Sequence, residues 1–132
     1  MNRDTNEKHI LLIDDEAYIR TVVKTCLVAF GRYKVSMAES GPEGLFIAKQ
    51  EHPDAILLDY MMPGMDGIML LRELRKDAST QSMPVIMLTA RAEPADQLKY
   101  AELDVFGVIS KPFEPLTLTT QVAKILGWES CN

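Results

Sequence analysis

The chain has 132 residues, of which 47% are hydrophobic and 25% charged, a composition that suits one globular domain with its own core. No apolar run approaches the roughly 18 residues of a membrane span, and no signal-peptide core is recognisable, so we expect a cytoplasmic protein without membrane contacts. The net charge of −5 comes without a basic run, which disfavours direct binding to nucleic acid. Cys26 and Cys131 lack metal-ligand spacing, so we expect free thiols instead of a zinc site.

Short apolar runs alternate with amphipathic helical patterns along the chain. Strands are predicted over 9–14, 33–37, 55–59, 85–89 and 106–110, and helices over 16–30, 40–51, 68–76, 94–103 and 115–127. Gly31 is expected to end the first helix, and Ser40 to cap the start of the second.

Strict alternation of strand and helix predicts an α/β fold with a parallel sheet covered by helices on both faces. For five strands we expect a flavodoxin-like (βα)5 sandwich of three layers, with the strand order 2-1-3-4-5. The domain is expected over 9–127, after a disordered segment at 1–8 and before a short tail at 128–132.

Polar residues follow four of the predicted strands. Asp14 and Asp15 follow the first strand, Asp59 the third, Thr89 the fourth and Lys111 the fifth. Because parallel strands of one sheet end at the same edge, these side chains should gather there. The ligand crevice of this fold opens between strands one and three, where the winding reverses, and the three carboxylates are predicted at that point.

Three clustered carboxylates repel one another, and a hard divalent cation such as Mg²⁺ (or Mn²⁺) would relieve that repulsion. Asp15, Asp59 and a backbone carbonyl just past Asp59 could supply ligands, with Asp14 acting through a water. A free oxygen of Asp59 could then attack phosphorus. The Lys111 ammonium and the Thr89 hydroxyl could each hold one phosphoryl oxygen.

Other interpretations compete with phosphoryl transfer to Asp59. Taken singly, a strand-end Asp is usually a helix cap and a lone Lys is usually solvated. A phosphohydrolase with an aspartate nucleophile needs a second Asp two positions later, where this chain has Glu16 after Asp14 and Met61 after Asp59. A flavin or dinucleotide binder needs a glycine- or hydroxyl-rich loop after the first strand, and the acidic residues at 14–16 would repel its phosphate.

A specific pattern is carried by four segments, LLIDDE at 11–16, PDAILLDYMMPGMDG at 53–67, PVIMLTA at 84–90 and VISKPF at 108–113. In this order they resemble the receiver domain of two-component response regulators, most of all the chemotaxis-like receivers, over about 8–127. The resemblance implies that Asp59 is the phosphoacceptor. Asp14 and Asp15 are then the acidic pair for Mg²⁺, and the Met61 carbonyl is the backbone ligand.

The same resemblance assigns the remaining site residues. Thr89 is the switch hydroxyl, Ala90 lies beside it at the phosphoryl group, and Lys111 contacts that group. The family usually has a cis bond before the proline that matches Pro112.

Three positions bear on how such a switch would behave. Many receivers carry Tyr or Phe three residues before the lysine, and this chain has Val108 there. We hypothesise that Thr89 still moves on phosphorylation and acts through backbone shifts around the fourth helix. Met61 and Arg91 occupy the two positions that tune dephosphorylation, and Met61 cannot position an attacking water, so we expect a phosphoryl lifetime of minutes or longer.

By resemblance the protein is a signalling switch, not an enzyme beyond its own phosphorylation and slow autodephosphorylation. A histidine kinase or histidine phosphotransfer protein donates the phosphoryl group. Binding of an unknown downstream target then changes at the face made by the fourth helix, fifth strand and fifth helix, which is also where a homodimer would form. Because only residues 128–132 follow the domain, we expect a stand-alone receiver or one cut from a longer regulator.

Overall fold

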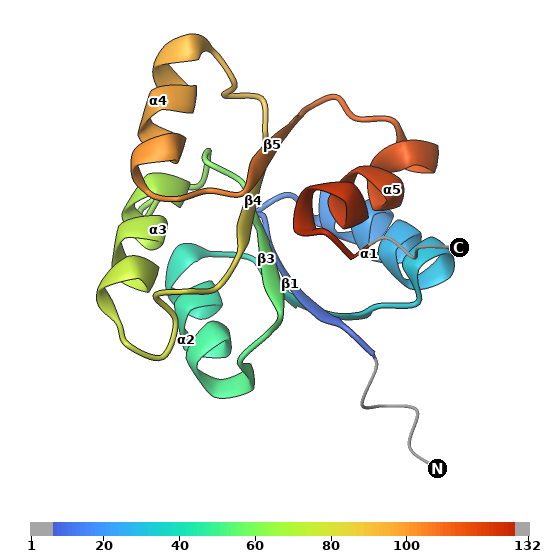
Figure 1. Cartoon of the computed structure of the whole chain (residues 1–132), viewed down its shortest axis with the longest axis horizontal. Coiled ribbons are helices and arrows are strands. Elements are labelled where there is room, and N and C mark those ends of the chain that lie inside the picture. The colour runs from blue at the N-terminus through green and yellow to red at the C-terminus, as the bar shows by residue number, and fades with distance from the viewer. Residues whose placement is uncertain (1–6, 129–132) are drawn as a thin grey trace.

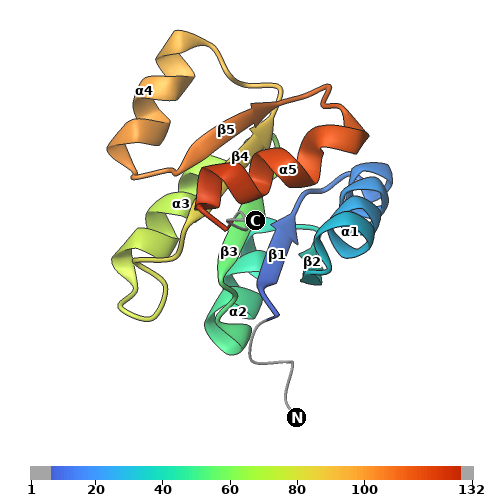
Figure 2. The ribbon, with the colours of Figure 1, turned by 45° about the vertical axis from the view of Figure 1, so that its right-hand side comes forward.

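The computed structural model describes residues 7–128, which form a five-stranded parallel sheet between two layers of helices (Figure 1). The strand order is β2-β1-β3-β4-β5, so the predicted flavodoxin-like topology is confirmed. Helices α1 and α5 cover one face of the sheet, and α2, α3 and α4 cover the other (Figure 2). Within the described residues, no helix is long and apolar enough to cross a membrane.

All ten predicted elements are present, with bounds shifted by at most one residue. The strands are β1 (His9–Ile13), β2 (Lys34–Ala38), β3 (Ala55–Leu58), β4 (Val85–Thr89) and β5 (Gly107–Ser110). The helices are α1 (Ala17–Gly31), α2 (Gly41–Glu51), α3 (Gly67–Lys76), α4 (Pro94–Glu102) and α5 (Pro115–Leu126).

Local side chains explain several helix ends. Ser40 caps α2 as predicted, since its hydroxyl accepts a hydrogen bond from the Glu43 N–H at 3.3 Å. Gly31 ends α1 as predicted, but not through a left-handed conformation of its own. It is the last residue of that helix, and Arg32 takes the left-handed cap with φ 57°. Packing explains the glycine at this position, because a Cβ there would lie 2.5 Å from the Tyr33 ring.

The central strands β1, β3 and β4 are buried on both faces, as expected when helices cover a parallel sheet. Leu11 and Ile13 point toward α2, α3 and α4, whereas Ile10 and Leu12 point toward α1 and α5. This packing makes the sheet a rigid support for the residues at its carboxyl edge.

The ends of the domain fall partly outside the described residues. Residues 1–6 of the segment expected to be disordered lie outside them, whereas the Lys8 carbonyl accepts a hydrogen bond from the Lys34 N–H at 2.9 Å. Trp128, which was expected in the tail, packs edge-on against Tyr33 with ring centroids 5.4 Å apart. Cys26 is a buried free thiol, as expected, and Cys131 lies outside the described residues.

Candidate functional site

The site is built on the two central strands β1 and β3, which pair in parallel with Ile13 opposite Leu58. Asp14 and Asp59 are the next residues after these strands. The Asp59 N–H donates to the Ile13 carbonyl at 3.1 Å, so the acidic residues continue directly from the sheet. Their backbone positions are therefore fixed by strand pairing.

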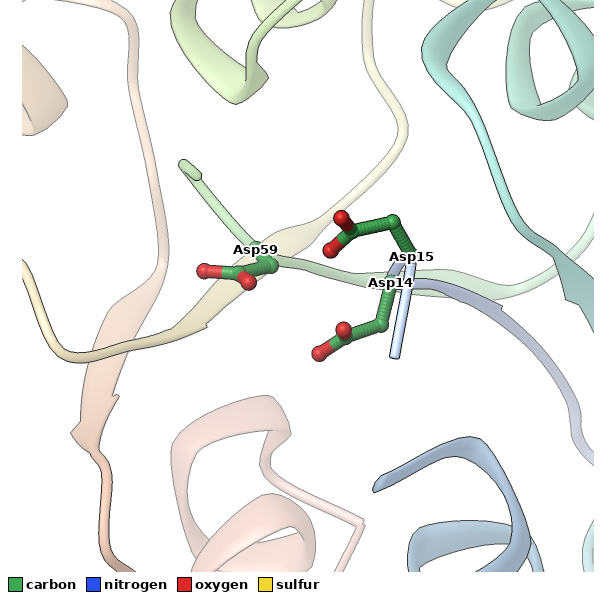
Figure 3. A group of neighbouring side chains, drawn as sticks. All are labelled: Asp14, Asp15 and Asp59. Carbon is green, nitrogen blue, oxygen red and sulfur yellow. The ribbon is translucent and has the colours of Figure 1, made fainter. Parts of the chain in front are cut away.

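The side chains of Asp14, Asp15 and Asp59 lie next to one another at this edge (Figure 3). One oxygen from each of Asp14, Asp15 and Asp59 lies within 4.8 Å of the other two. Asp14 is 1% exposed and Asp59 4% exposed, whereas Asp15 faces solvent. The predicted clustering of the three acids is thus present in the structure.

Lys111, from the loop after β5, reaches into this cluster. Its Nζ donates to Asp14 Oδ2 at 2.8 Å and to Asp59 Oδ2 at 3.1 Å, and lies 3.4 Å from Glu16 Oε1. Burial alone would lower the pKa of Lys111, but the hydrogen bonds and charges of Asp14 and Asp59 raise it, so the ammonium stays charged. The peptide bond between Lys111 and Pro112 is cis.

One ammonium does not fully compensate these acids. Burial raises the pKa of Asp14 above its ordinary value, although Lys111 and the Glu16 N–H both donate hydrogen bonds to it. A set of converging carboxylate oxygens with uncompensated charge is the donor set that a hard divalent cation prefers. Asp14, Asp15 and Asp59 therefore fit a magnesium ion by their chemistry and their spacing.

A cavity of about 290 Å³ opens beside Asp59. Its lining residues come from loops at the same edge of the sheet and are Asp15, Glu16, Asp59, Met61, Ala90 and Lys111. Thr89 is fully buried at the end of β4, where its hydroxyl accepts a hydrogen bond from the Arg91 N–H at 3.0 Å. The cavity adjoins the carboxylate of Asp59, and Lys111 is the cation among its lining residues.

Met61 lines this cavity, and the Arg91 side chain contacts Met61. The Met61 side chain is 52% exposed, and its N–H donates to Asp59 Oδ1 at 3.3 Å. The Arg91 guanidinium lies 3.7 Å from Met61 Sδ and stacks over the Tyr60 ring at 4.4 Å from its centroid.

Sequence reasoning missed three contacts at this site. Glu16 was considered only as a misplaced acid, yet it lies beside Lys111. Asp96 Oδ1 pairs with Arg91 at 3.1 Å, and the Tyr100 hydroxyl donates to the Arg91 carbonyl at 2.7 Å. Asp96 and Tyr100 lie in a helix that reads as largely polar, and no spacing in the sequence indicates that they meet Arg91.

Comparison with known proteins agrees with this geometry. A family model described as the response regulator receiver domain matches residues 10–123. A probable transcriptional regulator ycf27 of Porphyridium aerugineum is 42% identical over 91% of this chain and 48% of its own length. The phosphate regulon regulator PhoB of Pseudomonas aeruginosa is 38% identical over 90% of this chain and 52% of its own length.

Among solved structures, the chemotaxis response regulator CheY4 of Vibrio cholerae matches with a TM-score of 0.84 and 29% identity, covering 91% of this chain and 99% of that one. The chain spans about half the length of the curated relatives it matches. It is thus similar to whole single-domain receivers and to part of longer regulators.

Proposed function

Because the chain belongs to the response regulator receiver family and is therefore a phosphorylation-dependent signalling switch, we propose that Asp59 is its phosphoacceptor. The observation that carries this proposal is the placement of Asp59. It directly follows a central strand, lies among two further acids and Lys111, and adjoins a cavity large enough for a phosphoryl group. A histidine kinase or a histidine phosphotransfer protein is the donor that family membership indicates.

We propose that Asp14, Asp15, Asp59 and the Met61 carbonyl hold Mg²⁺ or Mn²⁺ at this edge. A bound Mg²⁺ supplies charge neutralisation on the oxygens of the transferring group. Asp14 belongs to this cluster and also contacts Lys111, because its Oδ2 accepts from Nζ at 2.8 Å. It therefore orients the lysine as well as adding negative charge for the cation.

The transfer itself can be assigned to residues of this chain. A carboxylate oxygen of Asp59 attacks phosphorus, the new O–P bond forms, and the P–N bond of the donor phosphohistidine breaks with its electron pair leaving on the imidazole. Lys111 Nζ, which already lies 3.1 Å from Asp59 Oδ2, can donate to a phosphoryl oxygen by a small rotation. Thr89 can donate its hydroxyl to another after turning away from the Arg91 N–H.

We also propose that downstream partners, and any homodimer, bind on the face made by α4, β5 and α5. We propose that the protein acts in the cytoplasm. Leu98 and Leu116 are exposed at 69% and 72% on the two helices of this face. We propose that this domain does not act as an enzyme on a separate substrate.

Asp59 is tested by treating the full chain with Mg²⁺ and a small acyl phosphate, then measuring the intact mass. Wild type should gain one phosphoryl group, and Asp59→Asn should gain none. Asp54→Asn is the matched control, because Asp54 lies just before the opposite end of β3, far from the cluster, and its side chain accepts from the His9 N–H at 2.8 Å. Phosphorylation of Asp59→Asn to the wild-type extent, or none in wild type, would contradict the proposal.

A further inference from the structure

Helix α4 is attached to the domain by unusual side chains. Its two buried residues are an acid and a tyrosine, Asp96 and Tyr100, and every other residue from Pro94 to Glu102 is exposed. By contrast, α3 buries five residues, among them Leu70, Leu71 and Leu74. Because α4 lacks an apolar stripe, its position depends on what these two side chains contact.

Tyr100 contacts the loop between β4 and α4. The side chain is 2% exposed and belongs to the same core cluster as Val108. The Tyr100 ring lies edge-on to Tyr60 with centroids 6.4 Å apart, and its hydroxyl donates to the Arg91 carbonyl at 2.7 Å. Burial raises the pKa of Tyr100, so the hydroxyl keeps its proton and can donate at any physiological pH.

Arg91 joins this helix to the phosphorylation site. Its N–H donates to Thr89 Oγ at 3.0 Å, while its carbonyl accepts from Tyr100 at 2.7 Å. Its guanidinium pairs with Asp96 and stacks on Tyr60, the residue after Asp59. A single residue is thus bonded on one side to the switch hydroxyl and on the other to both buried side chains of α4.

The far end of α4 is fixed differently. Arg75 of α3 donates from Nε to the Leu103 carbonyl at 2.9 Å and from a terminal nitrogen to the Asp104 carbonyl at 3.3 Å. These bonds lie at the carboxyl end of α4, away from Arg91. The helix therefore has one end fixed to α3 and one end whose attachment passes through Arg91.

We propose that Tyr100 is the positioning residue that transmits the state of Thr89 to helix α4, a coupling that rests on the proposed function of Asp59. When the Thr89 hydroxyl turns to a phosphoryl group, the Arg91 N–H loses its acceptor, and the peptide before the loop to α4 is free to shift. The Tyr100–Arg91 hydrogen bond carries that shift into the helix. The ring that β5 lacks at Val108 is thereby supplied by α4.

Amide hydrogen exchange of the full chain, with and without Mg²⁺ and beryllofluoride, tests this coupling over residues 92–102. Wild type should change its exchange there when the phosphoryl mimic is added. Tyr100→Phe keeps the ring and removes one hydrogen bond, so it should exchange roughly fivefold faster without the mimic. Adding the mimic to this variant should then change exchange by less than about twofold.

Controls separate this coupling from general loosening. Tyr33→Phe removes a hydroxyl from a partly buried tyrosine on the α1 side of the sheet and should respond like wild type. Asp96→Asn weakens the ion pair to the Arg91 side chain and leaves the Tyr100 bond intact, so it should keep the response to the mimic. Unchanged far-UV circular dichroism shows that each variant is folded.

The outcomes distinguish the coupling from the proposed function. If wild type gains a phosphoryl group by mass but its exchange over 92–102 does not respond to the mimic, the coupling is overturned while Asp59 keeps its role. If Asp59→Asn responds as wild type does, the proposed role of Asp59 fails. If wild type responds, Asp59→Asn does not, and Tyr100→Phe behaves like wild type, the coupling through Tyr100 is overturned while Asp59 keeps its role. Loss of the response in Asp96→Asn but not in Tyr100→Phe would assign transmission to the ion pair and would also overturn it.

Discussion

Met61 places an apolar thioether at the rim of the cavity beside Asp59, where a hydrolytic water would approach an acyl phosphate. Because the side chain has no group to orient that water, we predict a phosphoryl lifetime of minutes or longer. Met61→Asn should shorten it roughly tenfold, since a polar side chain can position the water.

The lifetime is measured as phosphate release in Mg²⁺ buffer. Met69→Asn is the control, because Met69 is similarly exposed, at 47%, but lies on α3 outside the cavity. Decay of the wild-type protein within seconds, or equal lifetimes for Met61→Asn and wild type, would refute the shielding role.

Asp14 illustrates the conflict between stability and function at one residue. Its pKa is raised by burial, so the native state binds this proton more tightly than the unfolded chain does. Stability therefore falls as pH rises from the ordinary pKa through the raised one, and the ionised carboxylate is destabilising at neutral pH. Asp14→Asn should raise the unfolding midpoint near pH 7 without metal, and should weaken Mg²⁺ binding about 10–100-fold.

Asp77 is a control for Asp14, because its pKa is shifted in the opposite direction. Hydrogen bonds from Ser79 and Lys49 lower its pKa to about 2, so its ionised form stabilises the fold above the ordinary pKa and this benefit is lost as pH falls toward 2. Asp77→Asn should therefore lower the midpoint at neutral pH and leave Mg²⁺ binding unchanged. Thermal unfolding across pH checks both signs, and a lower midpoint for Asp14→Asn at pH 7 would contradict the burial argument.

At the level of elements, Arg75 of α3 connects this helix to two loops, one after α4 and one before β4. Its guanidinium donates to carbonyls on both sides, at Leu103 and Asp104 after α4 and at Gln81 and Met83 before β4. Lysine cannot reproduce this planar fork, so Arg75→Lys should destabilise the domain by about 1–3 kcal/mol. Arg72→Lys, at an exposed position of the same helix, should change stability little.

Denaturant unfolding measures the loss of stability in Arg75→Lys, and hydrogen exchange shows which residues lose protection. The amides at 103–105 should lose protection in Arg75→Lys before the central strands do. Equal stability of the two arginine variants would show that the carbonyl contacts of Arg75 contribute nothing net.

Helix and strand identities were predictable because burial sets their periodicity, whereas helix ends depended on tertiary contacts. Ser40 acts within its own turn and was predicted correctly. Gly31 also ends its helix as predicted, but the reason for a glycine there is the close approach of the Tyr33 ring and of Thr119, and Thr119 comes from the distant helix α5. Hydrogen bonds within one turn can be predicted from the sequence, whereas close contacts between separate elements cannot.

For the whole molecule, one topological rule carried the prediction of the site. Parallel strands end at one edge, so Asp14, Asp59 and Lys111 could be placed together before any coordinates were known. The attachment of α4 had no such rule. It depends on side-chain directions in two loops, and the spacing of Arg91 and Asp96 in the sequence does not indicate that they pair. The clustering of these residues was therefore predictable, and its connection to α4 was not.

Mg²⁺ binding should stabilise the entire domain, because the three carboxylates converge only when β1 and β3 are paired. A ligand that binds only the native state adds about 2.7 kcal/mol to the free energy of unfolding at 100 times its dissociation constant. Denaturant unfolding of wild type with Mg²⁺ should show this gain, and a chelator should reverse it. Asp15→Asn, which removes an exposed ligand, should lose most of the gain while keeping its metal-free stability within about 0.5 kcal/mol. Sodium chloride of equal ionic strength controls for screening, and an equal gain in that salt or in Asp15→Asn would show that the acidic edge is not a specific cation site.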